Sequence, residues 1–288
     1  MLLPMDAAIR PVALPGGETV PALGLGTWQM GESARSRRAE VDAVRYALEL
    51  GYRLIDTAEM YGDGGAEEVV GEALAQGPVR REAVYLVSKV YPHNASRKGM
   101  ITACERSLKR LRSGHIDLYL LHWRGSVPLA ETVDTFERLR EQGKIRHWGV
   151  SNLDVADLAE LWSVDDGERC AANQVYYSAS QRGIEYDLLP WQRQFGVPAM
   201  AYCPIDQGAL AGNASLHAIA RARGATAAQV ALAWVLRHRD VIAIPKAVQQ
   251  AHLRDNFAAA SLALTVAELA QIDAAFPPPA HKRPLAMN

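Results

Sequence analysis

Four residues capable of acid–base chemistry follow neighbouring apolar runs in the first half of the chain: Asp56, Tyr61, Lys89 and His122. A phenol has an ordinary pKa of about 10, which is too high for ready proton exchange at neutral pH. An ammonium group beside the phenol stabilises its anion and lowers that pKa. We therefore expect Lys89 to supply this charge, Asp56 to hold Lys89 by a salt bridge, and His122 to orient an oxygen atom or share in the proton transfer. The group suits protonation of a carbonyl oxygen while hydride reaches its carbon.

Taken singly, each of these residues has an ordinary structural interpretation. A lysine at the end of a strand is usually a solvated charge, an aspartate there often caps a turn, and a tyrosine in a loop most often packs against its neighbours. Their joint placement at the ends of consecutive candidate strands is what favours a shared chemical role.

Short apolar runs alternate with stretches of helical period along the chain, which predicts parallel strands joined by helices. The eight candidate strands are residues 21–27, 52–56, 84–89, 116–122, 145–151, 170–175, 198–202 and 241–246. Apolar spacing predicts helices over residues 37–50, 98–111, 129–141 and 226–238. Thr226 and Gln229 have the spacing of a capping box at the start of the last of these helices.

Eight such alternations without a break in composition predict an α/β fold, a (β/α)8 TIM barrel, with residues 1–288 forming a single domain. Residues 10–23 contain two short β-like runs around Pro15-Gly16-Gly17, which indicates a β-hairpin. We expect this N-terminal hairpin to close the bottom of the barrel. In such barrels the chemistry lies at the carboxyl ends of the strands, where the four residues are expected.

The composition excludes several classes of function. The 31 lysines and arginines balance 32 aspartates and glutamates, for a formal net charge of −1, which argues against nucleic-acid binding. Cys104, Cys170 and Cys203 are widely spaced, so neither a disulfide framework nor a metal site is expected. The N-terminal MLLPMDAAIR does not fit a signal peptide, and no apolar run is long enough to cross a membrane. We expect a cytoplasmic protein without a membrane or nucleic-acid partner, and nothing in the sequence forces an oligomer.

Six segments, in order, resemble those of the aldo-keto reductases, and the resemblance extends over essentially the whole chain. They are residues 51–58 with Tyr61, 87–89, 120–123, 149–152, 173–174 and 244–246. The resemblance implies a barrel that binds extended NADPH without a Rossmann domain, and the chain contains no strand-flanked GxGxxG motif. It also implies that Tyr61 is the proton donor of a catalytic tetrad completed by Asp56, Lys89 and His122. A monomer is the oligomeric state that the resemblance implies.

The resemblance further assigns residues to the cofactor. Ser151, Asn152 and Gln174 would hydrogen-bond the carboxamide of the nicotinamide, and Tyr202 would stack on its ring. Asp255 and Asn256 match positions that bind the adenine. The complete set of implied cofactor residues is Thr27, Trp28, Ser151, Asn152, Gln174, Tyr202, Pro204, Lys246, Ala247, His252, Asp255 and Asn256.

The segment that would bind the 2′-phosphate departs from the family pattern. Lys246 matches the lysine that pairs with this phosphate, but Ala247 replaces a serine and His252 stands where an arginine is usual. A largely neutral imidazole is a weaker phosphate ligand than a guanidinium. Arg254 projects about 200° away from His252 if the segment is helical. We predict a preference for NADPH that is less strict than usual, and use of NADH stays open.

Aromatic residues just beyond three strand ends suggest a substrate pocket suited to aldehydes and ketones. They are Trp28, Tyr91 and Trp123, which would lie beside His122. Residues 206–213 and the C-terminal residues 276–288 are short segments, which suggests an open site for small or varied carbonyls.

Residues 54–61, 88–92 and 183–191 resemble a bacterial branch of the family whose members reduce methylglyoxal and related 2-oxoaldehydes with NADPH. A small-molecule 2-oxoaldehyde is therefore the expected substrate. The alternative is a cofactor-binding, redox-sensing regulatory subunit with little turnover, which an intact tetrad disfavours. Steroid double-bond reduction is disfavoured by His122, because family members with that activity have glutamate there.

Overall fold

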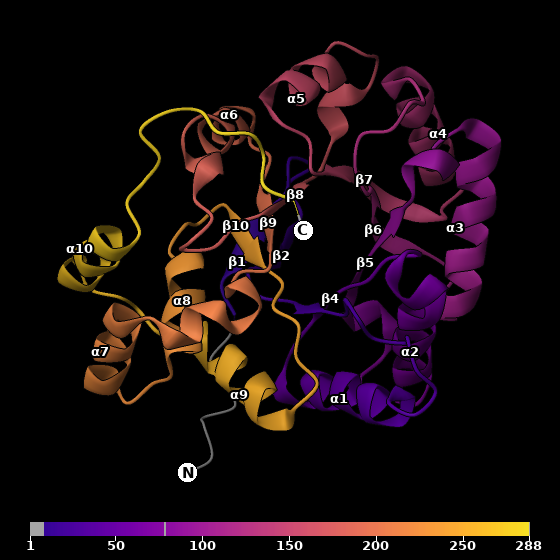
Figure 1. Ribbon diagram of the computed structural model, residues 1–288. Helices are drawn as coiled ribbons and strands as arrows, with labels where there is room; N and C mark the ends of the chain where they lie inside the picture. Colours follow the sequence, from indigo (N-terminus) through magenta and orange to yellow (C-terminus); the bar gives the residue numbers. More distant parts are fainter. Residues whose placement is uncertain (1–8, 78, 288) are drawn as a thin grey trace.

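Eight parallel strands close into a barrel in the computed structural model, which describes residues 9–77 and 79–287 (Figure 1). The strands are β3 (Leu25–Gly26), β4 (Leu54–Asp56), β5 (Tyr85–Val90), β6 (Ile116–Leu121), β7 (Ile145–Ser151), β8 (Asn173–Tyr176), β9 (Ala199–Tyr202) and β10 (Val241–Ala243). Each strand pairs with the next along the chain. Parallel bridges from Leu23 to Ala243 and from Gly26 to Lys246 join the first strand to the last, which closes the sheet. The predicted barrel fold is confirmed.

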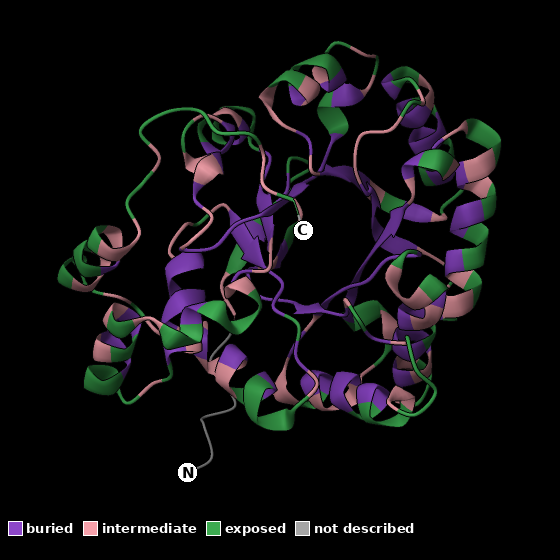
Figure 2. Ribbon diagram, viewed as in Figure 1, coloured by how far each residue is buried: buried purple, intermediate pink, exposed green. Residues whose placement is uncertain are grey.

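Helices surround the barrel, with buried residues facing the strands and exposed residues facing outward (Figure 2). They are α1 (Arg37–Leu50), α2 (Gly65–Ala75), α3 (Arg97–Leu111), α4 (Leu129–Glu141), α5 (Val155–Trp162), α6 (Leu188–Phe195), α7 (Ala214–Arg223), α8 (Ala227–Val235), α9 (Gln250–Ala259) and α10 (Val266–Ala275). No helix in the described part of the chain is long and apolar enough to span a membrane.

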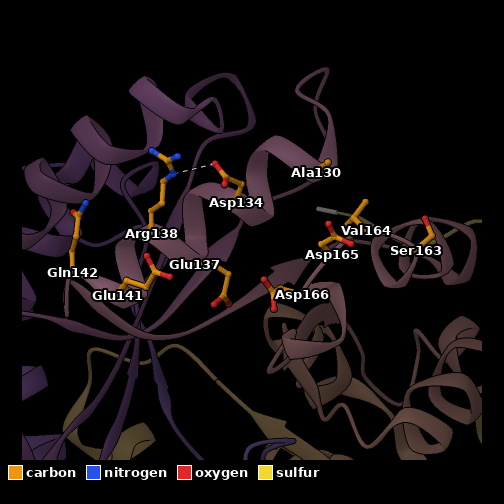
Figure 3. Close-up of a pocket in the computed structure, with 10 residues that line it drawn as sticks. All are labelled: Ala130, Asp134, Glu137, Arg138, Glu141, Gln142, Ser163, Val164, Asp165 and Asp166. Atoms are coloured by element: carbon orange, nitrogen blue, oxygen red, sulfur yellow. Dashed lines mark ion pairs between the residues drawn. The ribbon is translucent and has the colours of Figure 1, made fainter.

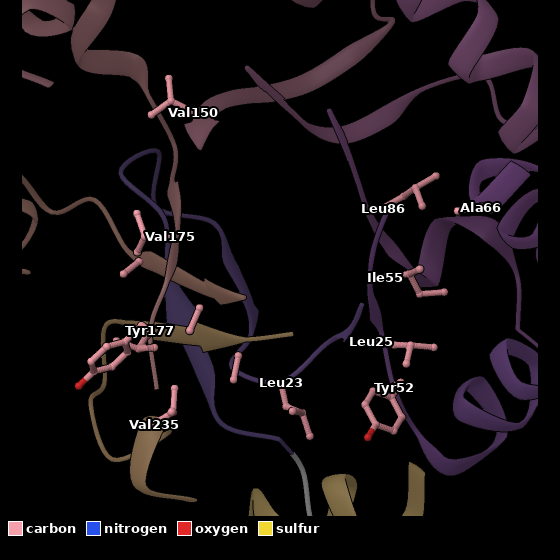
Figure 4. Packing of buried hydrophobic residues seen from close by; sticks show 14 of the residues in the cluster. Leu23, Leu25, Tyr52, Ile55, Ala66, Leu86, Val150, Val175, Tyr177 and Val235 are labelled. Carbon is pink, nitrogen blue, oxygen red and sulfur yellow. The ribbon is translucent and has the colours of Figure 1, made fainter. Parts of the chain in front are cut away.

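Side chains that alternate along the strands build two apolar layers, because successive residues of a strand point to opposite faces. Ile55 and Leu86 belong to the outer layer, which packs against the helices (Figure 4). Their neighbours Leu54 and Val87 belong to the inner layer, which fills the barrel. Both faces of each strand are thereby buried, which explains why the strands read as nearly continuous apolar runs.

The N-terminal hairpin consists of β1 (Pro11–Ala13) and β2 (Thr19–Pro21), which pair antiparallel. Gly17 has a φ of 84°, a conformation that glycine adopts without strain, so it completes the turn. Val12 and Val20 belong to the same buried cluster as Leu54 and Tyr85, the first residues of β4 and β5. The hairpin therefore closes the end of the barrel at which the strands begin, as predicted.

Most of the predicted strands and two of the predicted helices have bounds in the structure that differ from the predicted ones. Pro21 belongs to the hairpin, and the strand predicted from residue 170 begins at Asn173. The capping box of Thr226 and Gln229 is present, but α8 ends at Val235, three residues before the predicted end. The guanidinium of Arg10 donates to the backbone carbonyls of residues 236, 238 and 239, so the hairpin holds this segment outside the helix. The segment tested for a signal peptide lies almost wholly outside the described residues.

Candidate active site

A cavity of about 730 Å³ lies where the strands end. Its wall contains the last residues of four strands, which are Gly26 of β3, Asp56 of β4, Ser151 of β7 and Tyr202 of β9. It also contains Gln174 of β8. The barrel topology thus brings together residues that are far apart in the sequence, because the carboxyl ends of parallel strands meet at the same edge.

The ammonium group of Lys89 joins three of the four predicted catalytic residues. Lys89 Nζ donates to Asp56 Oδ2 at 2.8 Å, to the backbone carbonyl of Thr57 at 2.9 Å and to the phenolic oxygen of Tyr61 at 3.1 Å. The fourth residue, His122, lies next to Tyr61 in the cavity wall, and the centroids of their rings are 5.8 Å apart. The four side chains form one cluster.

Lys89 is fully buried, and its neighbours compensate for the loss of water. Burial lowers the pKa of the Lys89 ammonium, whereas the adjacent Asp56 carboxylate raises it. Gln174 Nε2 donates to Asp56 Oδ1 at 2.8 Å, so both carboxylate oxygens have a donor. Asp56 is thereby fixed as the counter-ion of Lys89, and Gln174 is its second partner, a role that its sequence position did not predict.

The expectation that Lys89 lowers the pKa of Tyr61 is wrong for this cavity. Burial raises the pKa of the Tyr61 phenol well above its ordinary value, and the charge of Asp56 acts in the same direction. Burial and a nearby negative charge both disfavour the phenolate. Tyr61 therefore rests in its protonated form, which is the form that a proton donor requires.

His122 is neutral in this site. Burial, and then the charge of Lys89, lower the pKa of the imidazole from 6.5 to about 2. Its Nδ1 atom is buried and has no hydrogen-bond partner among the described residues. A neutral imidazole can donate one hydrogen bond to an oxygen atom in the cavity, but it cannot act as a cationic acid near pH 7.

His122 should make the protein less stable in acid. The unfolded chain protonates this imidazole below its ordinary pKa of 6.5, whereas the folded protein does so only near pH 2, so stability falls between these values. From about pH 7.5 to about pH 5, the wild-type protein should lose about 2 kcal/mol more unfolding free energy than a His122→Gln variant. Urea unfolding at both pH values measures this difference. Parallel losses in the two proteins would show that His122 is not held neutral.

The predicted carboxamide-binding residues are connected to one another on one side of the cavity. The Asn152 side chain donates to the His122 carbonyl at 3.3 Å and to Ser151 Oγ at 3.2 Å. It accepts from the Tyr202 hydroxyl at 3.0 Å. The Tyr202 ring stacks on that of Tyr176, with centroids 5.4 Å apart. Polar groups and a flat aromatic face therefore lie side by side next to the tetrad.

The predicted phosphate end is also part of the cavity. Lys246, His252, Asp255 and Asn256 all line it, as does Pro204. Two predicted cofactor residues, Ala247 and Thr27, do not line the cavity, and the Thr27 hydroxyl instead donates to the Asp56 carbonyl at 2.9 Å.

Arg254 faces away from the phosphate end, as its helical position predicts. Its guanidinium donates to the Tyr46 hydroxyl at 2.9 Å on the outer side of the barrel. The lining of the cavity does not include it.

Two of the three predicted pocket aromatics, Trp28 and Trp123, line the cavity, whereas Tyr91 does not. Tyr91 instead packs edge-on against Trp123, with centroids 5.8 Å apart, and so supports the wall from behind. The sequence interpretation omitted other lining residues: Gly26, Gln29, Met60, Cys203, Ile205, Gln207, Gly208, Ala211, Ala228, Ile244, Pro245 and Met287. Gln29, Met60 and Cys203 directly follow or precede predicted site residues in the sequence. This adjacency could have identified them as lining residues.

Backbone strain is concentrated around this cavity. Gln29, Asn152, Cys203 and Gln207 line it and have positive φ angles between 48° and 60°, a region that residues other than glycine rarely adopt. Such conformations persist where the surroundings enforce them, and they are frequent at functional sites.

The short C-terminal tail covers part of the site that its length led us to expect to be open. Although short, it returns over the barrel mouth (Figure 1), and Met287 lines the cavity. Lys282 donates to Asp154 at 2.6 Å and to Asp187 at 2.8 Å, and Arg182 donates to the Phe276 carbonyl. The tail therefore covers part of the mouth, and residues 207, 208 and 211 of the other short segment line the cavity.

A second groove, of about 860 Å³, lies outside the barrel between α4 and residues 163–166 (Figure 3). Carboxylates dominate its wall, and Arg138 pairs with Asp134 there. None of the predicted site residues lines it. Among the described residues, no group of histidines, cysteines and carboxylates is arranged to hold a metal ion. The barrel-mouth cavity is therefore the candidate active site.

Residues 22–276 match the model of the aldo/keto reductase family. The methylglyoxal reductase YeaE of Escherichia coli (strain K12) is 54% identical over 277 residues, which cover 94% of this chain and 96% of that protein. The glyoxal reductase of Bacillus subtilis (strain 168) is 33% identical, with 91% of each chain covered. A crystal structure of an aldo/keto reductase from Klebsiella pneumoniae in complex with NADP and acetate has a TM-score of 0.93 at 51% identity, covering 97% of this chain and 100% of that one.

Proposed function

Because this chain belongs to the aldo/keto reductase family, as an NAD(P)H-dependent oxidoreductase, we propose that it reduces small 2-oxoaldehydes such as methylglyoxal with NADPH. The observation that carries this proposal is the buried contact of Lys89 with both Asp56 and the protonated phenol of Tyr61 at the cavity wall. The similarity to enzymes named methylglyoxal reductase and glyoxal reductase supports the substrate class.

The residues of the cavity fit a nicotinamide dinucleotide. The cavity volume of about 730 Å³ falls in the range of small-molecule sites. The related Klebsiella pneumoniae structure described above is a complex with NADP. His122 belongs to the same wall, and its buried Nδ1 atom has no hydrogen-bond partner among the described residues. At the far end, Lys246 offers a cation suited to a phosphate group.

We assign the cavity residues as follows. Ser151, Asn152 and the amide oxygen of Gln174 hold the carboxamide, and Tyr202 stacks on the nicotinamide ring. Lys246 and His252 take the 2′-phosphate, while Asp255 and Asn256 take the adenine. Trp28, Trp123 and Pro204 shape the apolar part of the site, with Tyr91 supporting Trp123.

The bound nicotinamide supplies the hydride, and the protein supplies the proton and the orientation. Neutral His122 donates a hydrogen bond that positions the carbonyl oxygen, and the Tyr61 phenol transfers its proton to that oxygen. Lys89, 3.1 Å from the phenolic oxygen, stabilises the phenolate that remains. Asp56 keeps Lys89 in place throughout.

We also propose that the protein is a single-domain, cytoplasmic monomer. The buried thiols of Cys104 and Cys170 are not joined in disulfides, which is typical of a reducing compartment.

An assay of NADPH and NADH oxidation with methylglyoxal, 4-nitrobenzaldehyde and a simple sugar tests the proposed reaction. Turnover of methylglyoxal with NADPH is the expected result. Binding of NADPH without turnover of any carbonyl would contradict the reductase and favour the regulatory subunit.

A His252→Arg variant should bind NADPH about tenfold more tightly and leave NADH affinity nearly unchanged. A guanidinium beside Lys246 adds charge-assisted hydrogen bonds to the phosphate, each worth about 1.5–3 kcal/mol before the side chain is ordered. Titration calorimetry with both cofactors measures the effect. Gln250→Arg, at an exposed position on the same helix that does not line the cavity, is the control for added positive charge. An equal effect in the two variants would mean that His252 does not face the phosphate.

A further inference from the structure

Solvent exposure divides the methionines that the structure describes into two groups. Met30, Met100 and Met200 are fully buried, whereas Met60 is 40% exposed and Met287 is 55% exposed. Both exposed methionines line the barrel-mouth cavity. The thioethers that solvent can reach in the described chain therefore lie at the candidate active site.

These two residues come from opposite parts of the chain. Met60 directly precedes the proton donor Tyr61 in the segment after β4. Met287 lies five residues beyond Lys282, whose contacts with Asp154 and Asp187 fix the tail across the mouth. Asp154 also caps α5, two residues after Asn152 in the cavity wall, so the tail is anchored to the rim itself.

We propose that Met60 and Met287 form an apolar lip at the substrate entrance, and that this lip is a site of oxidation by peroxides which changes the choice of substrate. The proposal rests on the reductase function. A thioether is flexible and polarizable, so it adapts to apolar groups of different shape. The lip would contact the part of a carbonyl substrate that projects out of the cavity.

Oxidation of each methionine is a two-electron oxygen transfer. The sulfur lone pair attacks one oxygen of hydrogen peroxide, an S–O bond forms and the O–O bond breaks. Sulfur is oxidised to the sulfoxide, and the peroxide is reduced to water. The sulfoxide is polar, so an apolar substituent loses a favourable contact at the lip, whereas a small 2-oxoaldehyde that lies within the cavity is affected less.

Peroxide treatment followed by dithiothreitol tests the proposal, because the thiol reverses disulfides and sulfenic acids, including any at Cys203, but leaves sulfoxides intact. Peptide mass spectrometry should find oxygen added to Met60 and Met287 before Met30, Met100 or Met200. For 4-nitrobenzaldehyde, kcat/KM should fall about tenfold, and for methylglyoxal about twofold or less. Methionine sulfoxide reductases should restore the original ratio of the two substrates.

The matched control is a Met60→Leu, Met287→Leu double variant, which keeps side chains of similar volume and has no sulfur at the lip. Each protein is compared with its own untreated sample. The variant should keep its substrate ratio after peroxide treatment. An equal change in the variant, or oxidation of the buried methionines at the same rate as the lip, would overturn the proposal. Absence of turnover in the untreated enzyme would instead overturn the reductase function. The order in which the methionines are oxidised is measured by mass spectrometry and does not depend on turnover.

Discussion

Replacing Tyr61 with phenylalanine is expected to lower kcat by about 10³-fold and to leave NADPH affinity within about twofold of the wild-type value. The change removes only the phenolic oxygen, which lies 3.1 Å from Lys89 Nζ. Hydride transfer to a carbonyl then leaves an alkoxide without a proton donor. Steady-state kinetics with methylglyoxal and calorimetric titration with NADPH separate the chemical step from cofactor binding.

Tyr119→Phe is the matched control for this prediction. Tyr119 is a fully buried tyrosine on β6, on the outer side of the barrel wall that packs against the helices. It does not line the cavity, so losing its oxygen should leave kcat within about twofold. A Tyr61→Phe enzyme with the kcat of this control would show that another group supplies the proton.

Replacing Lys89 with methionine is expected to lower both turnover and stability. The Asp56 carboxylate, only 1% exposed, loses its cation, and breaking a buried ion pair in this way costs about 3–5 kcal/mol. Turnover should fall by at least about 10²-fold, because the phenolate of Tyr61 forms without an adjacent positive charge. Urea unfolding and steady-state kinetics measure the two effects.

An Asp56→Asn, Lys89→Met double variant separates the two effects of this substitution. Asparagine removes the unpaired charge, so most of the lost stability should return, while turnover stays low because Lys89 is still absent. If the double variant is no more stable than Lys89→Met, the lost stability does not come from an uncompensated Asp56. If it regains turnover, Lys89 is not required for proton transfer.

The features that sequence predicted are those that depend on local pattern and on the geometry of parallel barrels. Strand ends can be recognised from apolar runs that stop at a polar residue, such as the one ending at Asp56. Once the barrel is inferred, those ends must converge, so the contact of Lys89 with Asp56 and Tyr61 follows. The bounds of the helix Arg37–Leu50 could be predicted correctly because its end depends on a local signal. Gly51 follows the last helical residue and has a φ of 112°, a conformation that ends helices.

The features that sequence missed depend on tertiary structure. Nothing in the tail sequence indicates that Lys282 pairs with Asp154, which lies 128 residues earlier. The raised pKa of Tyr61 follows from burial of the phenol and from the charge of Asp56, which the sequence pattern alone does not measure. Gln174 was interpreted as a cofactor ligand, and its bond to Asp56 appears only when β4 and β8 face each other across the barrel.

The two ends of the described chain lie at opposite ends of the barrel, and this has a practical consequence for handling the protein. The hairpin at the start closes the end where the strands begin, whereas Met287 lies in the entrance to the cavity. An affinity tag, a fused fluorescent protein or a resin linker joined directly after Met287 would therefore start beside the substrate entrance and crowd it. The same attachment directly before the hairpin lies at the opposite end of the barrel and leaves the entrance accessible, which makes the hairpin end the better point for immobilisation.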